Sequence, residues 1–99
     1  MDLPRGFDAV LHPPARLQIA AVLANVDDAE FSKLRELVGV SDSVLSKHLA
    51  ALAGADHIRL RKATSDGRQR TWASLTRTGR KAFNQHVAAL QALIAPAGR

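Results

Sequence analysis

The pattern of apolar and polar residues along the chain predicts five helices and one β-hairpin. Apolar residues recur at three- and four-residue intervals in five stretches, at about residues 3–11, 14–25, 28–38, 41–53 and 77–95, as on the buried face of a helix. Between residues 58 and 75 apolar positions instead alternate with polar ones, which is typical of strands. Asp66-Gly67 divides this region, and such a pair between two strand-like runs predicts a tight turn.

Residues at the expected helix ends support these boundaries. Asp27 followed by Glu30 has the spacing of a capping box, in which side chains bond the free N–H groups of the first turn. Gly39 follows the last apolar residue of the third helix, where a left-handed C-cap is expected. Ser41 and Thr76 precede the fourth and fifth helices and are expected to cap them.

The order of these elements predicts a single winged helix-turn-helix domain over residues 1–99, mainly α-helical with a small β-hairpin (α+β). A core of about residues 14–75 is complete without the terminal helices at about 3–11 and 77–95. Two surplus apolar faces on so small a domain indicate an interface. We therefore expect a twofold homodimer in which the terminal helices pack against their mates. The expected interface residues are Leu3, Phe7, Val10, Leu11, Phe83, Val87, Leu90 and Ile94.

Positive charge is concentrated around the predicted hairpin. Residues 57–81 contain eight Lys or Arg and one Asp, whereas residues 1–56 contain five Lys or Arg and eight Asp or Glu. Clustered positive charge favours a polyanionic partner, because each phosphate that it neutralises releases condensed counterions. Together with the helix-turn-helix pattern, this charge split predicts binding to double-stranded DNA.

The predicted recognition helix begins at Ser41 and carries short polar groups on its exposed face. A helix-turn-helix places the N-terminal residues of its second helix near base edges in the major groove. There Ser41, Ser43 and Ser46 would donate to phosphates, and Lys47 would reach a guanine edge or a phosphate. Arginine near the hairpin tip would enter the minor groove, where the negative potential is enhanced. The hairpin candidates are Lys62, Arg68 and Arg70.

Two groups of short motifs resemble known regulators. The recognition-helix segment Ser46-Lys47-His48-Leu49, followed by Leu52 and Ile58, resembles a pattern of ArsR-type repressors. The segment Asp66-Gly67-Arg68, followed by Leu75-Thr76-Arg77-Thr78-Gly79-Arg80, resembles the wing region of MarR-type regulators. The resemblance covers about residues 8–95 and extends to small single-domain winged-helix transcriptional regulators related to both families.

This resemblance implies a dimeric DNA-binding repressor or activator. It implies base contacts from Ser43, Ser46, Lys47 and His48, and wing contacts from Arg68 and Arg70. His48 also adjoins apolar residues of its helix, so the sequence leaves open whether its ring packs inward or contacts DNA. Asp56 stands where the family usually has glycine, and we expect it to adopt a positive φ.

Other classes of function find less support in the sequence. The chain has no cysteine, which excludes disulfides, thiolate zinc sites and thiol catalysis. His12, His57 and His86 are scattered, and no nucleophile–base pair, carboxylate pair or phosphate-binding loop indicates an enzyme. We therefore expect no metal and no cofactor. Apolar runs fall short of the roughly 18 residues that a membrane span needs, so we expect a cytoplasmic protein.

Two alternatives remain beside the DNA-binding regulator. In the first, the winged helix is a protein–protein interaction module whose basic face meets an acidic partner. Equal affinity for specific and random duplexes would favour that alternative. In the second, the regulator also binds a small-molecule effector at its dimer interface, and thermal stabilisation in a metabolite screen would identify it.

Overall fold

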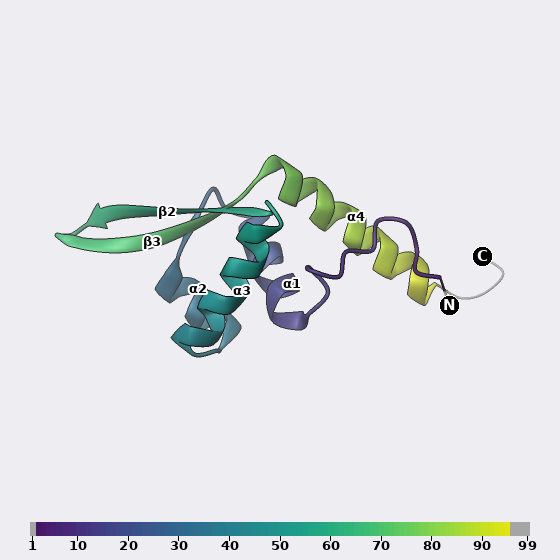
Figure 1. Ribbon diagram of the computed structural model, residues 1–99, viewed down its shortest axis with the longest axis horizontal. Coiled ribbons are helices and arrows are strands. Elements are labelled where there is room, and N and C mark those ends of the chain that lie inside the picture. The colour runs from purple at the N-terminus through teal and green to yellow at the C-terminus, as the bar shows by residue number, and fades with distance from the viewer. Residues whose placement is uncertain (1, 96–99) are drawn as a thin grey trace.

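A computed structural model describes residues 2–95 and has the predicted winged helix fold, mainly α-helical with a small sheet (Figure 1). The helices α1 (Pro14–Leu23), α2 (Phe31–Val38) and α3 (Asp42–Gly54) form the body. A short strand, β1 (Ala29–Glu30), precedes α2. The hairpin of β2 (Ile58–Ser65) and β3 (Arg68–Leu75) is followed by the long helix α4 (Arg77–Ile94).

The three helices of the body enclose an aliphatic core because each turns an apolar face inward. The side chains of Leu23, Leu34, Leu45 and Leu52 are fully buried there. Each such leucine contributes about 1.5–3 kcal/mol relative to an exposed one. Within residues 2–95, no helix combines the length and the apolar character that crossing a membrane would require.

Three predicted helix boundaries are confirmed. Gly39 ends α2 in the left-handed region, with a φ of 73°. Ser41 Oγ accepts the N–H of Val44 at 3.2 Å, and Thr76 Oγ1 accepts the N–H of Gly79 at 2.8 Å. Because the first turn of a helix leaves its N–H groups without partners inside the helix, these side chains fix where α3 and α4 begin.

The N-terminal segment is not helical, so the helix predicted at about residues 3–11 is wrong. Residues 2–13 contain only turns and bends. Asp8 Oδ1 accepts the N–H groups of Val10 and Leu11 at 2.9 and 3.2 Å, and such bonding competes with a helix. Gly6 has a φ of 92°, which no helix contains. Leu11 is fully buried in its own chain, which corrects its predicted place on a dimer surface.

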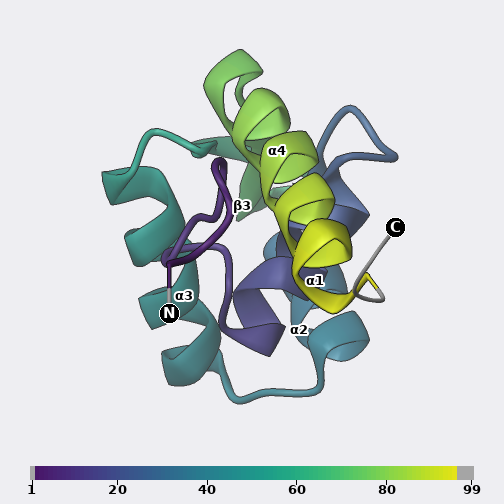
Figure 2. The same ribbon diagram turned by 90° about the vertical axis from the view of Figure 1, so that its right-hand side faces the viewer.

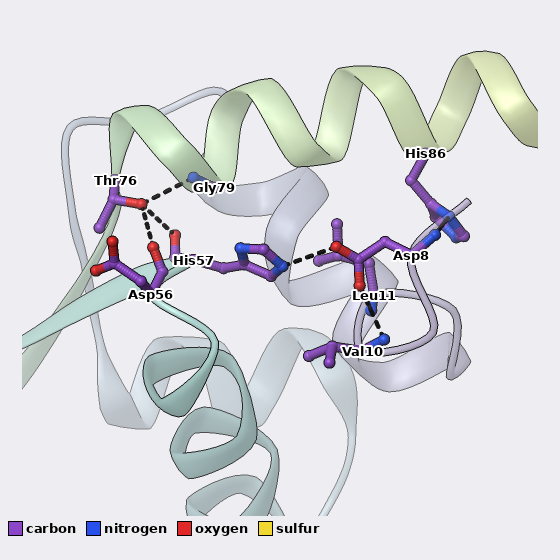
Figure 3. A network of polar contacts seen from close by, with 8 residues as sticks. All are labelled: Asp8, Val10, Leu11, Asp56, His57, Thr76, Gly79 and His86. Carbon is purple, nitrogen blue, oxygen red and sulfur yellow. Dashed lines mark hydrogen bonds and ion pairs between the residues drawn. The ribbon is translucent and has the colours of Figure 1, made fainter. Parts of the chain in front are cut away.

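The N-terminal segment is held against the rest of the chain by Asp8 and two histidines (Figure 3). Asp8 Oδ2 lies 2.9 Å from His57 Nε2, and the Asp8 N–H donates to His86 Nδ1 at 2.9 Å. Burial alone would raise the pKa of Asp8, but hydrogen bonds, chiefly that with His57, hold it below its usual value. Burial lowers the pKa of His86, and the proximity of His12 lowers it further. An ionised carboxylate and a neutral imidazole therefore secure this segment.

A short strand replaces the predicted capping box at residues 27–30. Ala29 and Glu30 pair antiparallel with Ala73 and Trp72 of β3, which gives a sheet of order β1-β3-β2. Glu30 is the N-cap of α2 but makes no capping bond with its side chain, so the prediction of a capping box is wrong. Burial of Ala29 against the core favours the extended conformation. This strand joins the base of the hairpin to α2.

The hairpin projects from the body as a wing. Its strands pair along their full length, out to Ser65 opposite Arg68. Asp66 and Gly67 have φ values of 54° and 73°, which confirms the predicted tight turn. The wing extends from one end of the molecule and α4 from the other, so the longest dimension is 58 Å and the others are 25 and 21 Å (Figure 1). Viewed from the α4 end, α3 lies to the left of α4, and α1 and α2 lie largely below it (Figure 2).

The first turn of α4 packs directly on the backbone where β2 begins. Gly79 is buried there, and a Cβ at this position would overlap the carbonyl oxygen of His57. The Thr76 N–H donates to that oxygen at 3.0 Å, and Thr76 Oγ1 donates to the Asp56 carbonyl at 2.6 Å (Figure 3). Asp56 has the expected positive φ, 62°. The Thr-x-x-Gly segment thus fixes how the wing is joined to α4.

Candidate nucleic-acid interface

The polar face of α3 is open to solvent. Leu45, Leu49 and Leu52 bury the opposite face, which orients the helix with its polar side outward. Serine hydroxyls and the free N–H groups of a helix N-terminus suit phosphate oxygens. The predicted contact residues of this face are exposed: Ser41, Ser43, Ser46 and Lys47.

An ion pair joins the start of α3 to the preceding helix. Arg35 Nη1 donates to Asp42 Oδ1 at 2.8 Å, and this hydrogen bond raises the pKa of Arg35. The guanidinium offsets a carboxylate that would otherwise repel phosphate. Arg35 is not among the residues predicted from the sequence, although a basic residue seven positions before an acidic one, across the turn of a helix-turn-helix, could have indicated this pair.

Two further residues of α3 lie at the edge of this face. Val44 is 39% exposed, although it adjoins Leu45 of the buried face of α3. An exposed apolar group on a recognition helix can contact a thymine methyl. His48 is half-buried and its ring makes no hydrogen bond within residues 2–95, so its contact with DNA stays a prediction.

The wing distributes its basic residues over two faces. Arg68 and Arg70 are two residues apart on β3 and share a face, whereas Lys62 lies opposite Thr71 and belongs to the other face. Lys62 and Arg68 are exposed, and neither has an ion-pair partner within the described part of the chain. No ion pair therefore offsets either charge, and the contact of both residues with DNA stays a prediction.

Two other arginines of the wing are paired with acidic residues of the body. Arg70 Nη1 donates to both carboxylate oxygens of Glu30, at 2.6 and 3.2 Å. Arg61 Nη2 donates to Asp28 Oδ2 at 2.8 Å, and its guanidinium carbon lies 5.9 Å from the centre of the Trp72 ring. The free positive charge of the wing is therefore smaller than the sequence alone indicates.

The wing and the start of α3 border the same hollow. The hollow has a volume of about 580 Å³. Its walls come from the start of α3, the start of α2 and the outer part of β3, namely Glu30, Phe31, Ser32, Asp42, Arg68, Gln69, Arg70 and Thr71. The start of α3 and the face of the wing that carries Arg68 and Arg70 therefore border the same side of the molecule, whereas Lys62 lies on the opposite face of the wing.

A helix-turn-helix with an exposed polar helix beside a basic hairpin defines a winged helix protein of the DNA-binding class. The family model of the winged helix DNA-binding domain matches residues 15–94. The chain belongs to this family, and the predicted relation to small winged-helix transcriptional regulators is confirmed.

The chain is also similar to two solved structures and to one relative in sequence. The transcriptional regulator homologue from Pyrococcus horikoshii OT3 has a TM-score of 0.80 and 26% identity, over 86% of this chain and 84% of that chain. YusO from Bacillus subtilis has a TM-score of 0.73 and 26% identity, over 82% of this chain and 57% of that chain. The uncharacterized protein MJ0432 of Methanocaldococcus jannaschii is 28% identical over 78 residues, 79% of this chain and 85% of the relative.

Proposed function

We propose that the protein is a sequence-specific transcriptional regulator that binds double-stranded DNA as a homodimer. In this proposal α3 enters the major groove, and the wing lies on the adjacent minor groove and backbone. The observation that carries the proposal is the hollow shared by the start of α3 and the outer part of β3. Side chains with free charge or hydroxyls border this side of the molecule, and the apolar face of α3 is turned away from it.

The contacts divide into those that position the duplex and those that select its sequence. Ser41, Ser43 and Arg68 would bind phosphates, which contributes affinity but little sequence preference. Lys47 and Val44 project from the exposed side of α3 and would meet a guanine edge and a thymine methyl. Changing these two residues should therefore alter which duplex is preferred as well as how tightly it binds.

The far end of α4 supports the dimer. Leu93 and Ile94 are 37% and 78% exposed, and Val87 and Leu90 are half-buried. Phe83 packs partly on its own core, so the surface left for a partner is the outer half of α4. Such a group of apolar side chains on a small domain favours an interface with a second copy. Two recognition helices would then be spaced about 34 Å apart, as a palindromic site requires.

The DNA-binding part of the proposal is tested with a duplex selected from a random library. Fluorescence anisotropy of the labelled duplex, with random duplex as competitor, should give a preference for the selected sequence. If six to ten phosphates are contacted per dimer, affinity should fall by about 10³–10⁵ between 50 and 200 mM salt. Equal affinity for the selected and random duplexes would contradict sequence-specific binding.

A matched pair of variants tests the wing. Arg68→Gln should weaken binding and reduce the slope of log affinity against log salt by about 0.9 for each phosphate that the variant no longer neutralises. Arg5→Gln is the matched control, because it removes the same charge from the N-terminal segment. This segment lies at the opposite end of the molecule from the wing (Figure 1), so the variant should leave the slope unchanged. If Arg68→Gln kept the wild-type salt slope as Arg5→Gln does, the wing would lie away from the DNA.

The dimer is tested separately by sedimentation equilibrium. Ile94→Glu should shift the protein toward monomer, because it places a charge within the proposed apolar interface. Leu37→Glu is the matched control, since Leu37 is 45% exposed on α2 and outside the proposed interface. A monomeric wild-type protein at micromolar concentration would exclude the dimer in solution.

A further inference from the structure

The Arg70–Glu30 pair is the outermost polar contact between the wing and the helical body within residues 2–95. β1 pairs with β3 only at Ala73 and Trp72, and Arg70 lies two residues further toward the tip. Beyond that point the wing is a two-stranded ribbon, which has little stability of its own in water. The direction of the ribbon therefore depends on whatever holds it at its last contact with the body.

Glu30 connects the wing to the first turn of α2. One carboxylate oxygen accepts from Arg70 at 2.6 Å, and the other accepts from the Ser32 hydroxyl at 2.7 Å. The pair is partly shielded from solvent, since the side chains of Arg70 and Glu30 are 31% and 15% exposed. The hydrogen bonds from Ser32 and Arg70 lower the pKa of Glu30, so this carboxylate stays ionised at neutral pH.

We propose that Arg70 is a positioning residue, which sets the angle of the wing over the DNA through Glu30 and does not itself contact a phosphate. This inference depends on the proposed function, because it assigns a role within the same DNA-binding side. Arg70 and Arg68 share a face of β3, so the sequence makes them look equivalent. The structure separates them, because both carboxylate oxygens of Glu30 accept from Nη1 of Arg70, whereas Arg68 has no ion-pair partner within residues 2–95.

Glu30 offers the sharpest test because two effects predict opposite results. If Glu30 acts only as a negative charge near the DNA, Glu30→Gln should strengthen binding. If Glu30 holds the wing, Glu30→Gln should weaken binding of the selected duplex by about threefold or more, within the range of coupling between contacting residues. Glu36→Gln is the matched control, because it also removes a negative charge, in this case from α2. Glu36 is exposed and forms no ion pair within the described residues.

The salt dependence separates Arg70 from Arg68. Arg70→Gln should weaken binding while leaving the salt slope of the wild-type protein, whereas Arg68→Gln should reduce that slope. The charge-swapped double variant Glu30→Arg/Arg70→Glu should recover at least part of the affinity that Arg70→Glu alone loses. Circular dichroism melting of each variant identifies any loss of folding, and the double variant provides a comparison with both charges retained.

Several results would overturn the positioning role. The first is a salt slope for Arg70→Gln that is reduced as much as that of Arg68→Gln. The second is tighter binding of the selected duplex by Glu30→Gln. The third is a double variant that recovers none of the affinity lost by Arg70→Glu. A wild-type protein that binds no duplex would instead overturn the proposed function. The two failures are therefore distinguishable.

Discussion

Gly79→Ala is expected to be strongly destabilising because the start of α4 lies in contact with the backbone of His57. An added Cβ would overlap the His57 carbonyl oxygen and lie 2.7 Å from its carbonyl carbon. Relief of this overlap requires the first turn of α4 to move away by about 1 Å or more, since ordinary carbon contacts are about 3.5–4 Å. That movement would strain the bonds from the Thr76 N–H to His57 and from the Gly79 N–H to Thr76.

The magnitude follows from these contributions. Overpacking costs about 1–3 kcal/mol, and two weakened hydrogen bonds cost about 1 kcal/mol each. The better helix propensity of alanine offsets about 1 kcal/mol. The free energy of unfolding should therefore fall by about 2–4 kcal/mol, which lowers the Tm by roughly 10 °C or more in a domain of this size.

Urea and thermal unfolding monitored by circular dichroism measure this loss. Gly54→Ala is the matched control, because Gly54 is the last residue of α3 and a Cβ there would meet no atom within 4 Å. This variant should be neutral or slightly stabilised. A Gly79→Ala protein within about 1 kcal/mol of the wild type would refute the close-packing argument.

Three further predictions concern the N-terminal segment and the capping of α4. Leu11→Ala should cost about 2–5 kcal/mol in urea unfolding, because Leu11 is fully buried; a loss below about 1 kcal/mol would mean that the segment does not belong to the core. Thr76→Val should cost about 1 kcal/mol in the same assay through loss of the cap, and an unchanged midpoint would contradict its role. Acidification should lower the free energy of unfolding, because folding lowers the pKa values of His86 and Asp8. As the pH falls, the unfolded chain therefore binds protons at a higher pH than the folded chain, and this binding favours unfolding. The loss should begin below about pH 6.5 through His86 and continue below about pH 3.8 through Asp8. The decrease between pH 6.5 and 5 should be smaller in His86→Gln, and an equal decrease would exclude His86 as its source.

Local signals in the sequence were sufficient for the body of the domain. The helical period, the glycine at position 39 and the hydroxyls at positions 41 and 76 act within a few residues of where they stand, so they predict boundaries well. The Asp66-Gly67 turn was equally predictable because its positive φ values limit which residues fit.

Two elements could not be predicted from the same signals. The spacing of the apolar residues in the N-terminal segment fits a helix, but the Asp8 side chain bonds the backbone locally and His57 and His86 hold it from far along the chain. A strand of two residues, such as β1, has no period to detect. Its pairing depends on β3, more than 40 residues later.

The candidate site was only partly predictable for a similar reason. Exposed serines and a lysine on α3 follow from the apolar pattern of the same helix. Charge clustering cannot distinguish Arg68 from Arg70, because the partner of Arg70 is Glu30, 40 residues earlier. The pairing of Arg35 with Asp42 spans the turn between two helices and became visible only once their angle was known.

The order of the sheet has a consequence for solubility. β2 lies at the edge of the sheet, so one side of its eight-residue backbone has no neighbouring strand within the described part of the chain. Open edges of this kind invite pairing with other chains and lead to aggregation. Arg59 and Lys62 are exposed on this strand and have no ion-pair partner within residues 2–95, so we expect their charges to repel an identical edge and to oppose the addition of one molecule's sheet to another's.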